Sequence, residues 1–129
     1  MSLKDDLRVL VVDDTSTSRA LIMKSLSEIG IKNIVDEDDG RKALHYIAAN
    51  PVHIILSDYH MPRMDGLELL EKLRKCPKRG KTGFLLITGD ESKAVVKEAQ
   101  ELGANNVITK PFTTATIRDA LERVVGKIS

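Results

Sequence analysis

The chain has 129 residues, 42% of them hydrophobic, which is enough for the core of a single domain covering residues 1–129. Its 20 Lys and Arg against 19 Asp and Glu leave a formal charge of +1, which excludes a general attraction to nucleic acid or to an acidic membrane. The single cysteine, Cys76, excludes an internal disulfide, and no apolar stretch approaches about 18 residues. We also expect no signal peptide, because acids stand near the first residue, where such a peptide needs positive charge and then an apolar run. We therefore expect a cytoplasmic protein whose function depends on a local site.

Short apolar runs alternate along the chain with longer stretches in which apolar residues recur at helical spacing. This alternation predicts an α/β fold, with a five-stranded parallel sheet and five helices on its two faces. In chain order, the expected elements are a strand at 7–12, a helix from a cap at Thr15 or Ser16 to Gly30, a strand at 33–36, a helix at 41–49, a strand at 52–57, a helix at 66–75, a strand at 84–88, a helix at 92–102, a strand at 106–109 and a helix at 113–126.

Polar residues stand at the ends of four of these strands. Asp13 and Asp14 follow the first strand, Asp58 follows the third, Thr88 ends the fourth, and Lys110 follows the fifth. Taken alone, each has a simpler interpretation as a helix cap, a turn residue or a solvated charge. Because ligands of open parallel sheets bind beyond the carboxyl ends of the strands, we expect these side chains to meet in one site.

Carboxylates from Asp13, Asp14 and Asp58 in one crevice would repel one another, and a hard cation such as Mg²⁺ relieves that repulsion. We expect Asp14 and Asp58 to be its direct ligands. A carboxylate can also attack a phosphoryl donor if nearby cations neutralise the charge on the transferring oxygens. In that chemistry, Lys110 is the expected cation and Thr88 the expected hydroxyl donor.

With these residues in place, the chain resembles the receiver domains of two-component signalling, and among them the CheY-like chemotaxis response regulators. The resemblance covers nearly the whole chain and implies the flavodoxin-like sheet order 2-1-3-4-5 of that family. Four segments carry it: VVDDTSTSR at 11–19, SDYHMPRMDGLELL at 57–70, LLITGD at 85–90 and TKPF at 109–112.

The resemblance also implies roles for the polar residues. Asp58 would be the phosphoacceptor, and it would hold Mg²⁺ together with Asp14 and the backbone carbonyl of His60, while Asp13 acts largely through bound water. Thr88 and Lys110 would contact the phosphoryl oxygens. The peptide bond between Lys110 and Pro111 would be cis, as is usual at this place in receivers.

Three further positions bear on how long the signal lasts and how it is transmitted. His60 and Asp90, two residues beyond Asp58 and Thr88, occupy sites that tune the loss of the phosphoryl group in receivers. Receivers of this type have an aromatic residue three positions before the lysine, which turns inward when the threonine moves, but here that switch position is Val107. Valine has no ring and is stiff about its one side-chain torsion, so the usual relay cannot operate unchanged.

The expected function is a chemotaxis switch that a histidine kinase phosphorylates and that then alters binding to the flagellar motor switch. The alternative is a phosphate sink that drains the kinase without binding the motor. A distant alternative is a small Mg²⁺-dependent hydrolase that forms an aspartyl phosphate, although the Asp-x-Asp of such phosphatases is missing, since Thr15 and His60 stand two residues after Asp13 and Asp58. Otherwise we expect no enzyme beyond self-catalysed phosphotransfer and autodephosphorylation.

The remaining expectations concern partners. We expect a monomer that binds neither nucleic acid nor membrane. The basic stretch at 72–81 has six Lys or Arg and no acid, and it is expected to be a solvated loop. The alternative is docking to an acidic partner, whereas the lack of interleaved aromatic residues argues against nucleic acid binding.

Overall fold

A computed structural model describes residues 3–89 and 92–128 of the chain. Five strands form one parallel sheet in the order β2-β1-β3-β4-β5, which confirms the expected fold class and strand order. The elements are α1 (Leu3–Asp6), β1 (Arg8–Val12), α2 (Ser16–Ile29), β2 (Asn33–Glu37), α3 (Gly40–Ala49), β3 (Ile54–Asp58), α4 (Gly66–Arg74), β4 (Gly83–Thr88), α5 (Lys93–Glu101), β5 (Asn106–Thr109) and α6 (Thr114–Val125).

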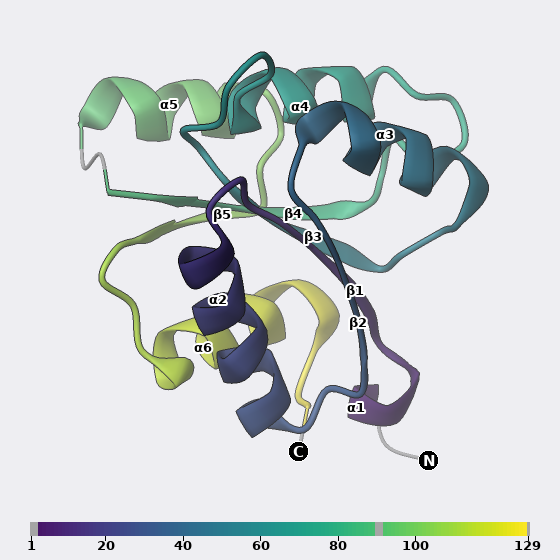
Figure 1. Ribbon diagram of the computed structural model, residues 1–129, viewed down its shortest axis with the longest axis vertical. Coiled ribbons are helices and arrows are strands. Elements are labelled where there is room, and N and C mark those ends of the chain that lie inside the picture. Colours follow the sequence, from purple (N-terminus) through teal and green to yellow (C-terminus); the bar gives the residue numbers. More distant parts are fainter. Residues whose placement is uncertain (1–2, 90–91, 129) are drawn as a thin grey trace.

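The sheet is covered on both faces, with α3, α4 and α5 on one side and α2 and α6 on the other (Figure 1). Successive side chains of β1 alternate between the two layers, so that Val9 and Val11 join the core under α2 and α6. Leu10 and Val12 join the core under α3, α4 and α5. This double burial explains why the strands are continuous apolar runs instead of alternating apolar and polar residues.

The helix ends follow from local chemistry. Gly30 ends α2 with a φ of 104°, a left-handed conformation that favours glycine, as its place after the apolar pattern predicted. Thr15 is the N-cap of that helix, and Ser92 and Thr113 are the N-caps of α5 and α6 instead of their first residues. Asp65 and Glu68 form a reciprocal capping box at the start of α4, which fixes where the loop after β3 ends.

The prediction of five helices is wrong by one, because the described residues include six. The additional helix, α1, is a single turn of four residues and is too short to show a helical period. Tertiary contacts hold it: Asn33 donates a hydrogen bond to the backbone carbonyl of Asp5, and Lys32 forms an ion pair with the Asp5 carboxylate. None of the helices in the described part of the chain has the length and apolar character needed to cross a bilayer.

The basic stretch at 72–81 is not simply a solvated loop, because its two arginines are structural. Arg79 donates a hydrogen bond from Nε to the backbone carbonyl of Ile47 at 2.9 Å. Arg74, half-buried at the end of α4, donates hydrogen bonds to the carbonyls of Gly80 and Thr82 before β4. It also donates to the carbonyl of Gly103 and the side chain of Asn105 before β5. One guanidinium therefore ties three segments together at the amino ends of β4 and β5.

Replacing Arg74 by alanine should lower the free energy of unfolding by about 3 kcal/mol, since several backbone carbonyls would lose a charged donor. Urea denaturation monitored by circular dichroism measures the change. The matched control is Lys78→Ala, an exposed charge in the same loop, which should shift stability by less than about 0.5 kcal/mol. Equal effects of the two substitutions would contradict a structural role for Arg74.

Candidate functional site

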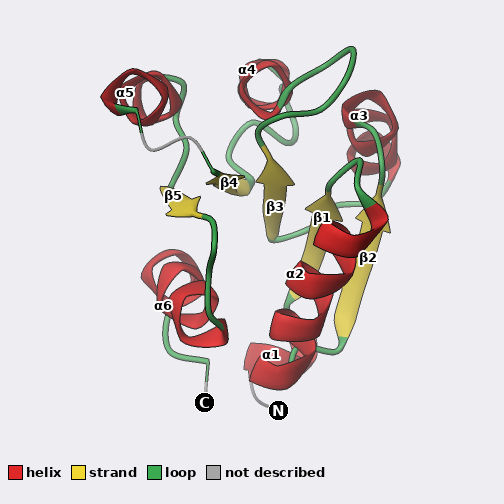
Figure 2. Ribbon diagram, turned by 60° about the vertical axis from the view of Figure 1, so that its left-hand side comes forward, coloured by secondary structure: helices red, strands yellow, loops and turns green. Residues whose placement is uncertain are grey.

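Three carboxylates meet at the carboxyl ends of β1 and β3, which finish on the same side of the sheet (Figure 2). One oxygen from each of Asp13, Asp14 and Asp58 lies within 4.8 Å of the others. We call these three residues the acidic cluster. Asp13 and Asp58 are buried, whereas Asp14 is exposed, so the cluster is open to solvent on the Asp14 side.

Strand register brings the acidic cluster together. Val12 at the end of β1 is level with Ser57 in β3, so the next residues of the two segments, Asp13 and Asp58, emerge side by side. On the other side of Asp58, Ile87 of β4 is its register partner, and this places the next residue, Thr88, beside the cluster. Thr88 itself is buried.

The start of α4 packs tightly against the backbone of Asp58. A side chain at Gly66 would place its Cβ 2.5 Å from the Asp58 carbonyl oxygen, closer than real contacts allow. The Gly66 amide donates to the carbonyl of Tyr59, and the Tyr59 amide donates to that of Ile87. The requirement for glycine at this position is therefore steric and serves to bring α4 close to Asp58.

Asp13 is the most constrained member of the cluster. Its Oδ1 accepts a hydrogen bond from the Thr15 amide at 2.9 Å, and its backbone carbonyl accepts one from Arg19 at 2.8 Å. Its Oδ2 is buried and has no hydrogen-bond partner among the described residues. A buried carboxylate oxygen without a partner, beside two further carboxylates, fits a hard cation or its bound water, so the residues present suit Mg²⁺.

Lys110 supplies the positive charge that reaches the acidic cluster. Its Nζ lies 3.0 Å from Asp58 Oδ1 and 3.2 Å from the hydroxyl of Ser18 in the first turn of α2. The Lys110 amide donates to the Thr88 carbonyl at 2.8 Å, and the peptide bond between Lys110 and Pro111 is cis. Ser18 was not among the residues expected from the sequence. Its position as the third residue of α2, close after Asp13 and Asp14 in the chain, could have suggested a hydroxyl near the site.

Burial raises the pKa of the Asp58 carboxyl above its ordinary value. The hydrogen bond from Lys110 opposes that rise, and the neighbouring charge of Asp13 adds to it. The raised pKa means that the folded protein holds the Asp58 carboxylate at a cost in free energy when no cation is bound. A cation close to the carboxylate would offset that cost.

The other residues expected in the site lie around this centre. His60 is exposed, and its ring lies 4.4 Å from that of Tyr59. Val107 is half-buried in β5, is level with Leu86, and packs against the core under α3, α4 and α5. Asp90 lies outside the described residues.

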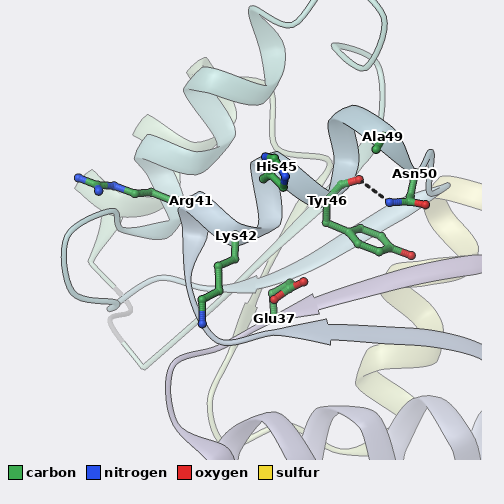
Figure 3. A pocket seen from close by; sticks show the side chains of 7 residues that line it. All are labelled: Glu37, Arg41, Lys42, His45, Tyr46, Ala49 and Asn50. Carbon is green, nitrogen blue, oxygen red and sulfur yellow. Dashed lines mark hydrogen bonds between the residues drawn. The ribbon is translucent and has the colours of Figure 1, made fainter.

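Two surface hollows border other parts of the molecule. The first, of about 630 Å³, lies beside α3, and no residue of the acidic cluster lines it. In this hollow, the side chains of Tyr46 and Glu37 face one another below that of His45 (Figure 3). The other, of about 580 Å³, runs between α2 and the segment after β5 and includes Ser18 and Lys110 in its wall. The second hollow therefore leads from solvent to the lysine that contacts Asp58.

Comparison with known proteins agrees with this arrangement. The family of response regulator receiver domains matches residues 9–122. A Rhizobium etli protein named "Probable chemotaxis protein CheY" is 38% identical over 128 residues, covering 99% of each chain. Chemotaxis protein CheY1 of Helicobacter pylori is 36% identical over 121 residues, covering 93% of this chain and 98% of that protein.

Solved structures show the same fold. The chemotaxis protein CheY4 of Vibrio cholerae is similar with a TM-score of 0.84 and 30% identity, covering 92% of this chain and 98% of that one. The signal receiver domain of a signal transduction histidine kinase from Syntrophus aciditrophicus is similar with a TM-score of 0.82 and 27% identity, covering 92% and 90%.

The raised pKa of Asp58 predicts a pH-dependent gain in stability on its removal. The folded protein favours the protonated form of the Asp58 carboxyl more than the unfolded chain does. Below pH 3.8, the ordinary pKa, this preference contributes fully to the free energy of unfolding. The contribution is lost as the pH rises through the raised pKa of the folded protein. Asp58→Asn should therefore stabilise the metal-free protein at pH 7 by about 1 kcal/mol, with the gain disappearing below that ordinary pKa.

Urea unfolding in EDTA across this pH range measures the effect. Asp119→Asn, at an exposed carboxylate of α6, is the control and should show little change at any pH. A loss of stability at pH 7 in Asp58→Asn would contradict the inferred strain.

Proposed function

The chain belongs to the family of response regulator receiver domains, of the kind found in CheY-like chemotaxis proteins, and we propose that a histidine kinase phosphorylates it on Asp58. The observation that carries the proposal is the Asp58 carboxylate, buried, 3.0 Å from the Lys110 ammonium and beside two further carboxylates. Such an arrangement suits a carboxylate that accepts a phosphoryl group and a signalling protein that changes state when it does so.

In the proposed reaction, a carboxylate oxygen of Asp58 attacks the phosphorus of a phosphohistidine. A phosphorus–oxygen bond to Asp58 forms as the phosphorus–nitrogen bond to the donor breaks, and the released imidazole takes up a proton. Lys110 balances charge on the transferring oxygens, and the Thr88 hydroxyl donates a hydrogen bond to one of them. Most of the work is positioning, which the register of β3, β4 and β5 supports.

The residues that would hold Mg²⁺ are Asp14, Asp58 and the backbone carbonyl of His60, with Asp13 acting through bound water. When bound, the ion offsets the negative charge that the phosphoryl oxygens add to the carboxylates. The partnerless Asp13 Oδ2 supports this assignment, since it is an acceptor with room for a donor such as a water on the ion.

The protein is proposed to act as a switch and not as an enzyme with an external substrate. Water would remove the phosphoryl group from Asp58 in the same site, so phosphotransfer and autodephosphorylation are its only reactions. His60 and Asp90 are the positions proposed to tune that hydrolysis. His60 is exposed, as a residue that controls the access of water must be.

The proposed output is a change in binding to the flagellar motor switch, started by movement of Thr88. Val107 argues for the second candidate, a phosphate sink, because it is half-buried and has no ring to carry the usual relay. Residues 1–129 would form one receiver domain, acting as a cytoplasmic monomer without nucleic acid or membrane partners.

Asp58→Asn should abolish phosphorylation, because an amide cannot form the acyl phosphate. Incubation with Mg²⁺ and acetyl phosphate, followed by intact-protein mass spectrometry, measures the phosphoryl adduct. Asp119→Asn is a control that keeps the site intact and should be labelled like the wild type. A Mg²⁺-dependent adduct that persists in Asp58→Asn would show that another residue is the acceptor.

Beryllofluoride, a stable mimic of a phosphoryl group on Asp58, should tighten binding to a flagellar motor-switch peptide by about tenfold when Mg²⁺ is present. Fluorescence anisotropy of the labelled peptide measures it, with Asp58→Asn as the control that cannot take up the mimic. Capture of beryllofluoride without peptide binding would instead favour the phosphate sink.

A further inference from the structure

An ion pair joins two loops that flank the acidic cluster. Arg63, in the loop between β3 and α4, donates a hydrogen bond from Nη2 to Asp39 Oδ2 at 2.8 Å, and Asp39 lies between β2 and α3. The side chain of Asp39 is only 10% exposed, whereas that of Arg63 is 62% exposed. We call this ion pair the clasp.

Sheet order gives the clasp its place relative to the site. Because β1 lies between β2 and β3, a contact from the loop after β2 to the loop after β3 passes beyond the carboxyl end of β1. Asp13 and Asp14 follow that end. The clasp therefore bounds the acidic cluster on the side of α3 and α4.

A second contact joins the start of α3 to the loop after β3. Gly40, the first residue of α3, is so close to Met64 that a Cβ on it would lie 3.1 Å from the Met64 sulfur. Met64 is buried, and its neighbour Arg63 has a φ of 68°, in the left-handed region that residues other than glycine rarely adopt. Such a backbone carries a cost in free energy that surrounding contacts offset, and the clasp and the packing of Met64 are contacts of this kind.

Asp39 is itself held in place at the start of α3. Its Oδ1 accepts hydrogen bonds from the amides of Arg41 at 2.7 Å and Lys42 at 3.4 Å, which makes it the N-cap. The hydrogen bond from Arg63 and these amides lower the pKa of the Asp39 carboxyl, so the pair is charged at neutral pH. One oxygen thus anchors α3 while the other anchors the loop after β3.

We propose that the Asp39–Arg63 clasp is a positioning contact that holds the loop after β3, and with it the main chain of His60, beside the acidic cluster, so that the affinity for Mg²⁺ depends on it. The inference rests on the proposed function, because His60 is a metal ligand only in that proposal. Its physical basis is that the loop is fixed at Tyr59 and at Gly66 by backbone hydrogen bonds, while the clasp restrains the part between them.

The test is the double substitution Asp39→Asn with Arg63→Gln. It leaves the net charge near the metal unchanged, keeps a side-chain acceptor that can cap α3, and replaces the arginine with a side chain too short to span the gap. The Kd for Mg²⁺, measured by isothermal titration calorimetry, should rise about threefold. The matched control is Asp38→Asn with Lys42→Gln, which removes an exposed ion pair of the same charges within one segment and should leave the Kd unchanged.

A second measurement needs no metal. Amide hydrogen exchange at residues 59–65 of the metal-free protein should be about threefold faster in the Asp39, Arg63 double variant and unchanged in the control. If the wild type binds Mg²⁺ and the double variant has the same Kd, the positioning role of the clasp is overturned and the proposed function is not. The same holds if hydrogen exchange is the same in the two proteins. A wild type that bound no Mg²⁺ would overturn the proposed function together with the metal role of the clasp.

Discussion

Mutual repulsion among three carboxylates, with Lys110 the one ammonium group that contacts them among the described residues, is the constraint on which the proposed chemistry depends. Asp13 and Asp58 are buried, so their charges are costly, and Lys110 contacts only one of the two. The unpartnered oxygen of Asp13 and the raised pKa of Asp58 are two signs of the same imbalance. A site with this imbalance is stabilised by added positive charge, which suits the cation of the proposed function.

The rest of the fold keeps these charges from separating. A carboxylate cluster on mobile loops would relax apart, but here Asp58 is the last residue of β3, and Asp13 and Asp14 come directly after β1. Both strands have two buried faces. Gly66 lets α4 approach the Asp58 backbone, and the chain enters the site from β5 with the Lys110 amide bonded to Thr88. The free energy of core burial therefore holds the carboxylates in an unfavourable arrangement. Functional sites often lower the stability of a protein in this way, and the rest of the fold offsets the loss.

The two sides of the site differ in how freely they could move when Asp58 is modified. On the side of α3 and α4, the clasp and the contact of Gly40 with Met64 restrain the loop after β3. On the side of β5, Val107 is half-buried, packs against the core and offers no ring to rotate. A phosphoryl group on Asp58 would therefore meet a restrained loop on one side, and its effect would pass mainly through Thr88 and the segment near Lys110.

The sequence by itself determined the strands, their parallel arrangement and the residues that follow them, because a strand buried on both faces must be apolar and its carboxyl end must lead into a loop. It missed α1, whose single turn has no period, and it treated Arg74 as a solvated charge. Only the tertiary structure decided that Ser18 contacts Lys110 and that Arg63 reaches Asp39. These contacts join residues far apart in the chain, and they depend on side-chain reach and helix placement, which no local pattern encodes.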